Sequence, residues 1–403
     1  MIKISYIKRK MKEVDAEDLI QVFPMAAGAL LAPFNRKKYK DLWIISDEKL
    51  EARDNGYHFF KYVKKEHPEQ HCCFAISKKA EDYAKVKKIG EVVDQGSIDH
   101  WIRYFTCEYN ISSQKGGKPN AALCAFFELM DVFKVKNVFL QHGVTKDLND
   151  WMMADRCRFT YVITAMESEY QFVKDSFGYP ENTVHNTGFP RYDNLHDYEA
   201  IPNRIIIMPT WRKWIRYDSE GDDALKSDFP NSEFFLKWKE FLNSEGLERL
   251  IDQYHLEILF YPHRHMQKYT DFLKKSISPK IKIASFDEYD IQELMRSARM
   301  MITDFSSVYF DMIYMKKPVL FYQFDEKQFR QHHYQEGWFD YHNNPFGKSF
   351  SEYKPMLAEL EKIIKAEYCV SKEYLAAHRK ELTNWDRNNS ERVYQLLKSN
   401  HIQ

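Results

Sequence analysis

The chain has 403 residues, and its 59 Lys and Arg residues balance 59 Asp and Glu residues, so its formal net charge is zero. Proteins that bind nucleic acid through phosphate contacts normally carry a basic excess, and the sequence therefore predicts no nucleic-acid partner. The length fits two domains of about 100 to 200 residues each. A composition with 44% hydrophobic and 29% charged residues is typical of a folded globular protein and excludes a disordered chain. The six cysteines contain no C-x-x-C pair and we expect no signal peptide, so the sequence favours the cytoplasm and neither zinc nor disulfides.

An uncharged run from Leu19 to Asn35 lies between two basic clusters near the start of the chain. The first forty residues hold nine basic and four acidic side chains. The run contains Pro24 and Pro33 and is shorter than the roughly 20 apolar residues that a spanning helix needs. Two interpretations remain open: a helix that packs on the first domain, or a peripheral segment at the cytoplasmic face of the membrane, where each basic residue near the surface adds about 1 kcal/mol.

From Asp41 onward, short apolar runs alternate with segments of helical period, which predicts parallel sheets flanked by helices. In the first half we expect helices at 55–65 and 121–133 and strands at 42–46, 72–77, 104–112, 137–141 and 161–164. After a polar stretch at 192–203 the pattern resumes, with strands at 204–208, 256–261, 281–284, 300–303 and 319–322. A final helix is expected at 390–399.

This alternation predicts an α/β protein with two Rossmann-like, doubly wound domains. Such domains bind ligands at the carboxyl ends of their strands, and we expect the two to face a central cleft. The expected boundaries are 1–197 for the first domain, 198–375 for the second and 376–403 for a helical segment at the end.

The first candidate site is Gln141-His142-Gly143, directly after the apolar strand VFL. Gly143 permits a tight turn, and His142 has the right pKa range for a general base, a general acid or a phosphate ligand. A loop histidine with a purely structural role is the alternative.

Two further sites follow strands of the second half that end in proline. Met208-Pro209-Thr210-Trp211-Arg212 offers a hydroxyl and a guanidinium that suit oxyanions, and Tyr261-Pro262-His263-Arg264-His265 offers ionisable groups. Ordinary polar loop residues beside strand-ending prolines are the alternative for each.

In the fourth site the strand Met300–Thr303 runs into Asp304-Phe305-Ser306-Ser307, and helical spacing resumes from Val308 to Met315. Asp304 or Ser306 is expected to cap that helix, whose free N–H groups would suit a phosphate. A plain helix cap is the alternative. The sequence contains no D-x-D pair, Walker loop or G-x-G-x-x-G fingerprint, so we expect Arg212, His263 and the helix end to neutralise a diphosphate without a required metal or cofactor.

Taken in order, five motifs resemble the CDP-glycerol glycerophosphotransferase family of teichoic acid polymerases and primases. They cover about residues 130 to 325, and the stretch from Trp43 to Phe60, with Asp54-Asn55-Gly56, also resembles this family's amino-terminal part. The motifs are Gln141-His142-Gly143, Gly188-Phe189-Pro190-Arg191-Tyr192-Asp193, Pro209-Thr210-Trp211-Arg212, Pro262-His263 and Thr303-Asp304-Phe305-Ser306-Ser307-Val308-Tyr309-Phe310-Asp311.

The resemblance implies a GT-B-like fold and transfer of an alditol phosphate from CDP-glycerol or CDP-ribitol to a lipid-linked or polymer acceptor, with release of CMP, in teichoic acid or capsule synthesis. It places the two family histidines at His142 and His263, and we assign His142 as general base. The donor-binding positions that it implies, together with Arg212 and Asp304 from the residues themselves, are Gly143, Arg191, Pro209, Thr210, Arg212, His263, Asp304, Ser306, Ser307 and Asp311.

Two other functions compete with this interpretation. A GT-B glycosyltransferase would form a glycosidic link in place of a phosphodiester, because the fold does not choose the reaction. A noncatalytic partner in a polymer-assembly complex would bind CDP without turnover.

Overall fold

The computed structural model describes residues 16–215 and 228–399 and divides the chain into two compact units. Unit 1 consists of Met1–Thr145, Asn149–Asn194 and Leu382–Gln403, and unit 2 consists of Lys146–Leu148 and Leu195–Glu381. The end of the chain is therefore not a separate helical part, as 376–403 was expected to be. Of the two last helices, α16 belongs to unit 2 and α17 belongs to unit 1. The short piece Lys146–Leu148, which follows His142, also belongs to unit 2.

Unit 1 is built on a parallel seven-stranded sheet with the strand order β3-β2-β1-β4-β5-β6-β7. Within it, Trp43 of β1 pairs with Cys72 of β2 and with Tyr109 of β4. Consecutive buried positions in the central strands reflect a sheet that is covered on both faces, as in doubly wound folds. The strands are β1 (Trp43–Ser46), β2 (Cys72–Ile76), β3 (Val92–Asp94), β4 (Tyr109–Ser112), β5 (Lys136–Phe139), β6 (Tyr161–Thr164) and β7 (Val184–Asn186).

Helices pack against this sheet, and one hydrophobic cluster joins it to α6 and α7 through Ile44, Cys73, Trp101, Tyr104 and Leu123. Asp54, Ser97 and Asn120 cap three of the helices by accepting backbone N–H groups. The helices of unit 1 are α2 (Ala16–Ile20), α3 (Val22–Tyr39), α4 (Asn55–Glu66), α5 (Tyr83–Lys87), α6 (Ile98–Thr106), α7 (Ala121–Leu129), η1 (Asp150–Met152), α8 (Glu167–Ser176), η2 (Pro190–Asn194) and α17 (Asn389–Ser399).

Unit 2 is built on a parallel six-stranded sheet with the order β10-β9-β8-β11-β12-β13. Met300 of β11 pairs with Ile205 of β8, and Met301 pairs with Val319 of β12. Trp238 lies in the core cluster of this unit, with its ring centroid 5.2 Å from that of Tyr322. The strands are β8 (Arg204–Met208), β9 (Glu257–Phe260), β10 (Ile281–Ile283), β11 (Met300–Thr303), β12 (Val319–Tyr322) and β13 (Gly347–Phe350).

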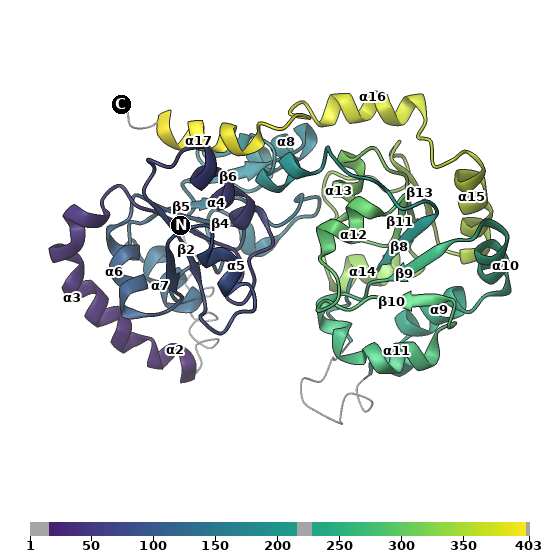
Figure 1. The fold of residues 1–403 in the computed structure, drawn as a ribbon, viewed down its shortest axis with the longest axis horizontal. Coiled ribbons are helices and arrows are strands. Elements are labelled where there is room, and N and C mark those ends of the chain that lie inside the picture. Colours follow the sequence, from purple (N-terminus) through teal and green to yellow (C-terminus); the bar gives the residue numbers. More distant parts are fainter. Residues whose placement is uncertain (1–15, 216–227, 400–403) are drawn as a thin grey trace. The chain divides into compact units, whose positions relative to one another are not determined.

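The helices of unit 2 surround this sheet in Figure 1. Ser232, Ser244 and Asp290 cap α9, α10 and α12. The helices are η4 (Phe229–Asn231), α9 (Glu233–Leu242), α10 (Glu245–Tyr254), η5 (Arg264–Tyr269), α11 (Thr270–Ser276), α12 (Ile291–Ser297), α13 (Tyr309–Tyr314), α14 (Glu326–His332), α15 (Tyr353–Lys365) and α16 (Lys372–Glu381).

The structure confirms two doubly wound parallel sheets, and it differs from the expected elements in three respects. The helix expected at 121–133 ends at Leu129. Residues 104–106 end α6, so the strand expected from Tyr104 begins only at Tyr109. The sequence pattern also missed β3, β7 and β13, each of which is only three or four residues long.

The apolar run near the start of the chain forms α3, which continues through Pro33 instead of breaking there. Gly28 lies against α6, where an added Cβ would stand 2.5 Å from the Cβ of Trp101. Figure 1 shows α3 along the outside of unit 1, next to α6. Across the described ranges, 16–215 and 228–399, no helix combines the length and apolar character that crossing a membrane requires.

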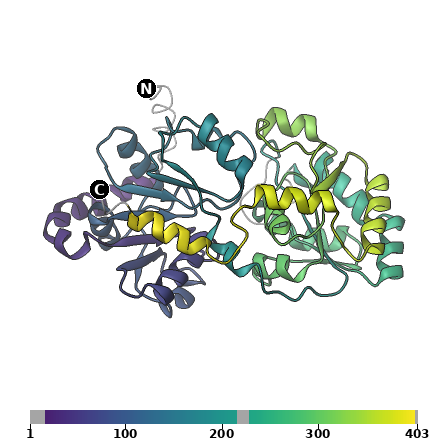
Figure 2. The same cartoon turned by 90° about the horizontal axis from the view of Figure 1, so that it is seen from above.

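The last helix, α17, completes unit 1, whereas α16 lies on unit 2 (Figure 2). Asp193 accepts hydrogen bonds from the backbone N–H groups of Asn389 and Ser390, at 2.8 and 2.9 Å. The ring of Tyr394 stacks on His67 with centroids 3.5 Å apart, and Glu391 bonds the same histidine at 2.7 Å. The carboxylate of Asp193, the last residue of the second motif, thus binds the N-terminal end of α17.

Each sheet contains one point at which the strand order reverses. It lies between β1 and β4 in unit 1 and between β8 and β11 in unit 2. Open α/β sheets bind ligands outside the carboxyl ends of the strands at this point. A ligand site is therefore expected at the loops that follow β1, β4, β8 and β11.

Candidate functional site

His142 lies in the turn after β5, and the side chains around it fix that turn. Gln141 has a positive φ of 59°, an unusual conformation for a residue other than glycine, and its amide donates to the Ile163 carbonyl at 2.6 Å. The buried carboxylate of Glu169 accepts from the same amide and from the Thr145 backbone N–H. These bonds hold both ends of the turn while the His142 side chain stays exposed.

Desolvation in its pocket lowers the pKa of His142, the positive charge of Arg191 lowers it further, and a hydrogen bond with the Ser113 backbone opposes both. The imidazole is therefore neutral at pH 7, which is the form that a general base requires.

One amide, that of Asn55, joins two of the motif segments in unit 1. Its Nδ2 donates to the Gln141 carbonyl at 2.7 Å, and its Oδ1 accepts from the Arg191 backbone N–H at 3.1 Å. The Arg191 side chain is buried and pairs with Asp54 at 3.1 Å. In this structure its guanidinium is paired within unit 1, and donor binding by Arg191 stays a prediction. Gly143 also lies in unit 1.

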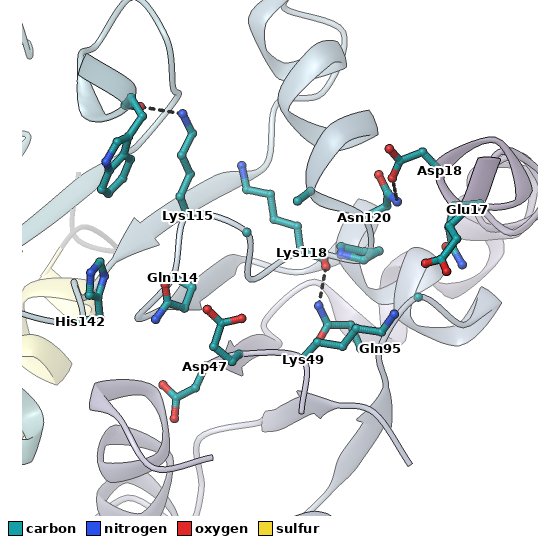
Figure 3. A pocket seen from close by; sticks show the side chains of 17 residues that line it. Glu17, Asp18, Asp47, Lys49, Gln95, Gln114, Lys115, Lys118, Asn120 and His142 are labelled. Atoms are coloured by element: carbon teal, nitrogen blue, oxygen red, sulfur yellow. Dashed lines mark hydrogen bonds between the residues drawn. The ribbon is translucent and has the colours of Figure 1, made fainter. Parts of the chain in front are cut away.

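A cavity of about 560 Å³ opens in unit 1 with His142 in its wall (Figure 3). Loops that follow β1, β3, β4 and β5 line it, together with α2. It therefore occupies the point at which the strand order of this sheet reverses.

In unit 2, three neighbouring strands are joined at their carboxyl ends by one buried arginine. Arg212 follows β8, Asp304 follows β11 and Asp325 follows β12. The guanidinium donates to both oxygens of Asp325, at 2.6 and 2.9 Å, pairs with Asp304 at 2.9 Å and donates to the Thr210 carbonyl at 2.6 Å. Burial opposes its charge, but the two carboxylates outweigh that effect and hold the pKa of Arg212 above its ordinary value.

This cluster places two of the expected donor residues in the interior of unit 2. Arg212 and Asp304 are both 0% exposed, so neither side chain is open to solvent, and their contact with a donor stays a prediction. Asp304 accepts instead from the Thr210 backbone N–H at 2.8 Å, and it does not cap the following helix. That helix, α13, begins at Tyr309, and Val308 occupies its N-cap position without a capping hydrogen bond from a side chain. Ser306 therefore does not cap the helix either. Asp311 is also buried, within the first turn of α13.

The groups that remain available at this edge are His263 and the Ser306-Ser307 pair. All three are half-buried, and the two hydroxyls have no hydrogen-bond partner among the described residues. Thr210 is adjacent in the chain to Trp211, whose ring centroid lies 6.1 Å from that of His263. The hydroxyl of Thr210 is buried and, within the ranges described, unpartnered. Pro209 is buried at the end of β8.

His263 is a neutral donor in this arrangement. Burial, the charge of His265 and that of Arg264 lower its pKa to about 4. Its Nδ1 accepts from the His265 backbone N–H at 3.3 Å, which assigns the ring proton to Nε2. A neutral Nε2–H suits a phosphate oxygen.

Sequence reasoning missed two residues that lie close to these groups. His333 stacks on Phe329 with centroids 4.6 Å apart, contacts the Trp211 ring, and accepts from the Lys213 backbone through Nδ1. Lys146 is buried beside Asp147, which also binds Arg330 at 2.6 Å. The adjacent opposite charges of Lys146 and Asp147, four and five residues after His142, are the feature of the sequence that could have pointed to them. Over the parts of the chain that the structure describes, no group of three or more His, Cys, Asp or Glu side chains is arranged to hold a metal ion.

Two doubly wound parallel sheets, with polar loops at both strand-order reversals, define the chain as a GT-B-like α/β protein. A solved structure of the wall teichoic acid polymerase TagF matches with a TM-score of 0.63 at 15% identity, over 99% of this chain and 98% of that one. A putative UDP-N-acetylglucosamine 2-epimerase from Listeria monocytogenes matches with a TM-score of 0.55 at 14% identity, over 90% of this chain and 97% of that one. At these identities both matches concern the fold alone.

The family model of CDP-glycerol:poly(glycerophosphate) glycerophosphotransferase matches residues 29–399. The chain belongs to this family. It is 30% identical over 381 residues to the minor teichoic acid biosynthesis protein GgaB of Bacillus subtilis (strain 168), a match that covers 90% of this chain and 40% of that protein. It is 27% identical over 183 residues to the teichoic acid glycerol-phosphate primase of the same strain, covering 43% of this chain and 42% of the primase. The chain thus spans less than half the length of these relatives.

The buried arginine generates a prediction about stability. Arg212→Met should destabilise the protein by about 3 to 5 kcal/mol, because it leaves two buried carboxylates without their counterion. Urea unfolding measures the loss. Arg249→Met, which removes an exposed arginine paired with Glu361 at 3.5 Å, is the control and should cost less than about 1 kcal/mol. Loss of CDP affinity with unchanged stability in Arg212→Met would contradict the structural role.

Proposed function

We propose that the chain transfers glycerol phosphate from CDP-glycerol to a hydroxyl of a polymer or lipid-linked acceptor in teichoic acid or capsule synthesis and releases CMP. Membership of the family supports this proposal, and so do the teichoic acid relatives. The observation that carries it is that a histidine lies near the strand-order reversal of each unit, His142 in unit 1 and His263 in unit 2. CDP-ribitol is the alternative donor within the same family.

The chemistry exchanges one phosphate ester bond for another. The acceptor oxygen forms a bond to the phosphorus that carries the glycerol, the bond from that phosphorus to the CMP oxygen breaks, and CMP leaves with the bonding electrons. The acceptor proton goes to the neutral imidazole of His142. In such loose transition states the protein mainly positions the reactants and stabilises phosphoryl charge.

Donor binding is proposed for the groups that remain free in unit 2. The Nε2–H of His263 and the hydroxyls of Ser306 and Ser307 would donate to diphosphate oxygens, with Thr210 behind them. Because these groups and the nearby basic residues supply the hydrogen bonds, we propose that no metal or other cofactor is required.

The outer face of α3 supports a peripheral position at the cytoplasmic membrane surface. Phe23, Leu30 and Phe34 are 74%, 75% and 85% exposed, whereas Gly28 and Ala32 are buried against the unit. Four basic residues follow in the last turn and just after it: Arg36, Lys37, Lys38 and Lys40. An apolar face next to positive charge suits the surface of an anionic bilayer, where acceptors attached to lipids would lie.

The reaction is tested by incubating the protein with CDP-glycerol or CDP-ribitol and a panel of oligosaccharide and lipid-linked acceptors. CMP release together with a phosphodiester product by mass spectrometry is expected. His142→Ala should lower turnover by at least about 100-fold and leave CDP affinity nearly unchanged. Because the pKa of His142 is lowered, the base stays deprotonated as pH falls toward 6, so the acid limb of kcat should lie below the ordinary histidine value of about 6.5. A glycosidic product, CDP binding without turnover by any acceptor, or full activity of His142→Ala would contradict the proposal.

Donor binding is tested by titrating the protein with CDP in a calorimeter, with EDTA present. The Ser306→Ala, Ser307→Ala double variant should bind CDP about tenfold or more weakly, because it loses hydrogen bonds to a charged group. Ser351→Ala, an exposed serine of unit 2, is the control. Equal affinities in the three proteins would count against these hydroxyls, and binding only after Mg²⁺ is added would count against metal-free binding.

Membrane association is tested by flotation with vesicles of phosphatidylglycerol and phosphatidylcholine. The Leu30→Ser, Phe34→Ser double variant should lose flotation, because it removes apolar side chains that enter the bilayer. The wild type should also lose flotation at high salt, because salt screens the attraction between the basic residues and the anionic lipid. Leu236→Ser, a 50% exposed leucine of unit 2, should float as the wild type does. Equal flotation of all three, or of a chain that lacks the first 40 residues, would refute the role of α3.

A further inference from the structure

We propose that the cavity beside His142 holds the end of the acceptor, and that this end is a neutral sugar ring. This inference rests on the proposed function, because it names the substrate of the unit that carries the general base. Of the acceptors that the proposed function allows, the inference selects one in which the attacking hydroxyl belongs to a sugar and not to an anionic glycerol phosphate terminus.

The position of the cavity is that of a substrate site. Asp47, Glu48 and Lys49 follow β1, and Gln114 and Lys115 follow β4, so the two loops at which the strand order of unit 1 reverses form part of the wall. Ligands of open α/β sheets bind at this point. In Figure 3, Gln114 is drawn next to His142, and Glu17 and Asp18 stand at the other end of the view.

The charged side chains in the wall leave no surplus of positive charge. Asp47 is buried and saturated, because it accepts from three backbone N–H groups and from the Ser113 hydroxyl. Lys118 pairs with the buried Glu128, and the Lys115 ammonium donates to the carbonyls of Trp151 and Arg156 at 2.6 and 3.1 Å.

The wall charges with no partner among the described residues are Lys49, Glu17 and Glu48. In all, the wall holds three lysines (Lys49, Lys115 and Lys118) and four carboxylates (Glu17, Asp18, Asp47 and Glu48). This set does not attract a phosphate, because anion sites need an excess of donors and positive charge. The cavity therefore suits an uncharged ligand.

Uncommitted hydrogen-bonding groups in the wall suit hydroxyls. The side-chain amide of Gln114 makes no hydrogen bond to another described residue, so it offers both a donor and an acceptor. Trp151 adds an aromatic side chain to the same wall. The loop that carries Gln114 is held in place, since Gln95 donates to the Lys118 carbonyl at 3.0 Å.

The size of the cavity favours a ring over a three-carbon alditol. Its volume of about 560 Å³ lies within the range of roughly 300 to 1,000 Å³ that holds ligands of several rings, far more than glycerol fills. A second hollow of about 320 Å³ adjoins it and shares Lys115, Lys118 and Trp151 with it. Ala122, Ala125 and Phe126 give that hollow a more apolar wall, which leaves room for the next part of an acceptor.

The test measures sugar binding without donor, by saturation-transfer NMR on the full chain. The probes are methyl β-D-glucopyranoside, as a neutral ring, and glycerol 3-phosphate, as an anionic terminus. We expect saturation of the glucoside but not of glycerol 3-phosphate. Gln114→Leu, which keeps the volume of the side chain but loses its amide, should weaken glucoside binding about three- to tenfold. Gln171→Leu, an exposed glutamine of unit 1, is the matched control and should bind as the wild type does.

Preferential binding of glycerol 3-phosphate, or glucoside binding that Gln114→Leu leaves unchanged, would overturn the inference. Circular dichroism of both variants verifies that any loss is not unfolding. Because no CDP-alditol is present, this result is independent of turnover. Glucoside binding in a protein that releases no CMP would contradict the proposed function alone, and CMP release without glucoside binding would contradict this inference alone.

Discussion

The buried guanidinium of Arg212 is the interaction on which the candidate donor edge of unit 2 depends. It lies between the carboxylates that follow β11 and β12, and it is itself part of the loop that follows β8. A charge with no access to water is tolerable only when it is paired and fully hydrogen-bonded. The three loops are therefore held in fixed positions relative to one another. The half-buried side chains that follow Asp304, those of Ser306 and Ser307, are held in place with them.

In unit 1, side-chain amides and carboxylates hold the loops at the strand ends in position, where unit 2 uses a buried arginine. Asn55 joins the turn of His142 to the segment of Arg191, Glu169 holds the far side of that turn, and Asp47 gathers the backbone at the start of α4. Residues that look functional in the sequence thus divide into two groups. Some are exposed and able to meet substrate, as His142 is, and others hold the first group in position.

The sequence predicted the apolar central strands well but missed three of the four edge strands, for a physical reason. Buried strands such as β8 and β11 are continuous apolar runs, so their bounds were predicted without error. In contrast, β13 reads Gly-Lys-Ser-Phe and lies at the edge of its sheet, where no apolar pattern is needed. The motifs likewise located the loops of the site, but not which side chains in them are free. An arginine after a strand is equally compatible with binding an anion and with binding Asp325, a residue 113 positions away that only the tertiary structure brings near.

The discontinuity of unit 1 has a consequence for how the chain reaches its native state. The segment that closes this unit, with α17 bound to Asp193 and His67, follows all of unit 2 in the sequence. Domains tend to fold in the order in which the ribosome delivers them. Here the second unit emerges whole while the first still lacks its last helix, so the unit that carries His142 is completed only after the unit that carries His263.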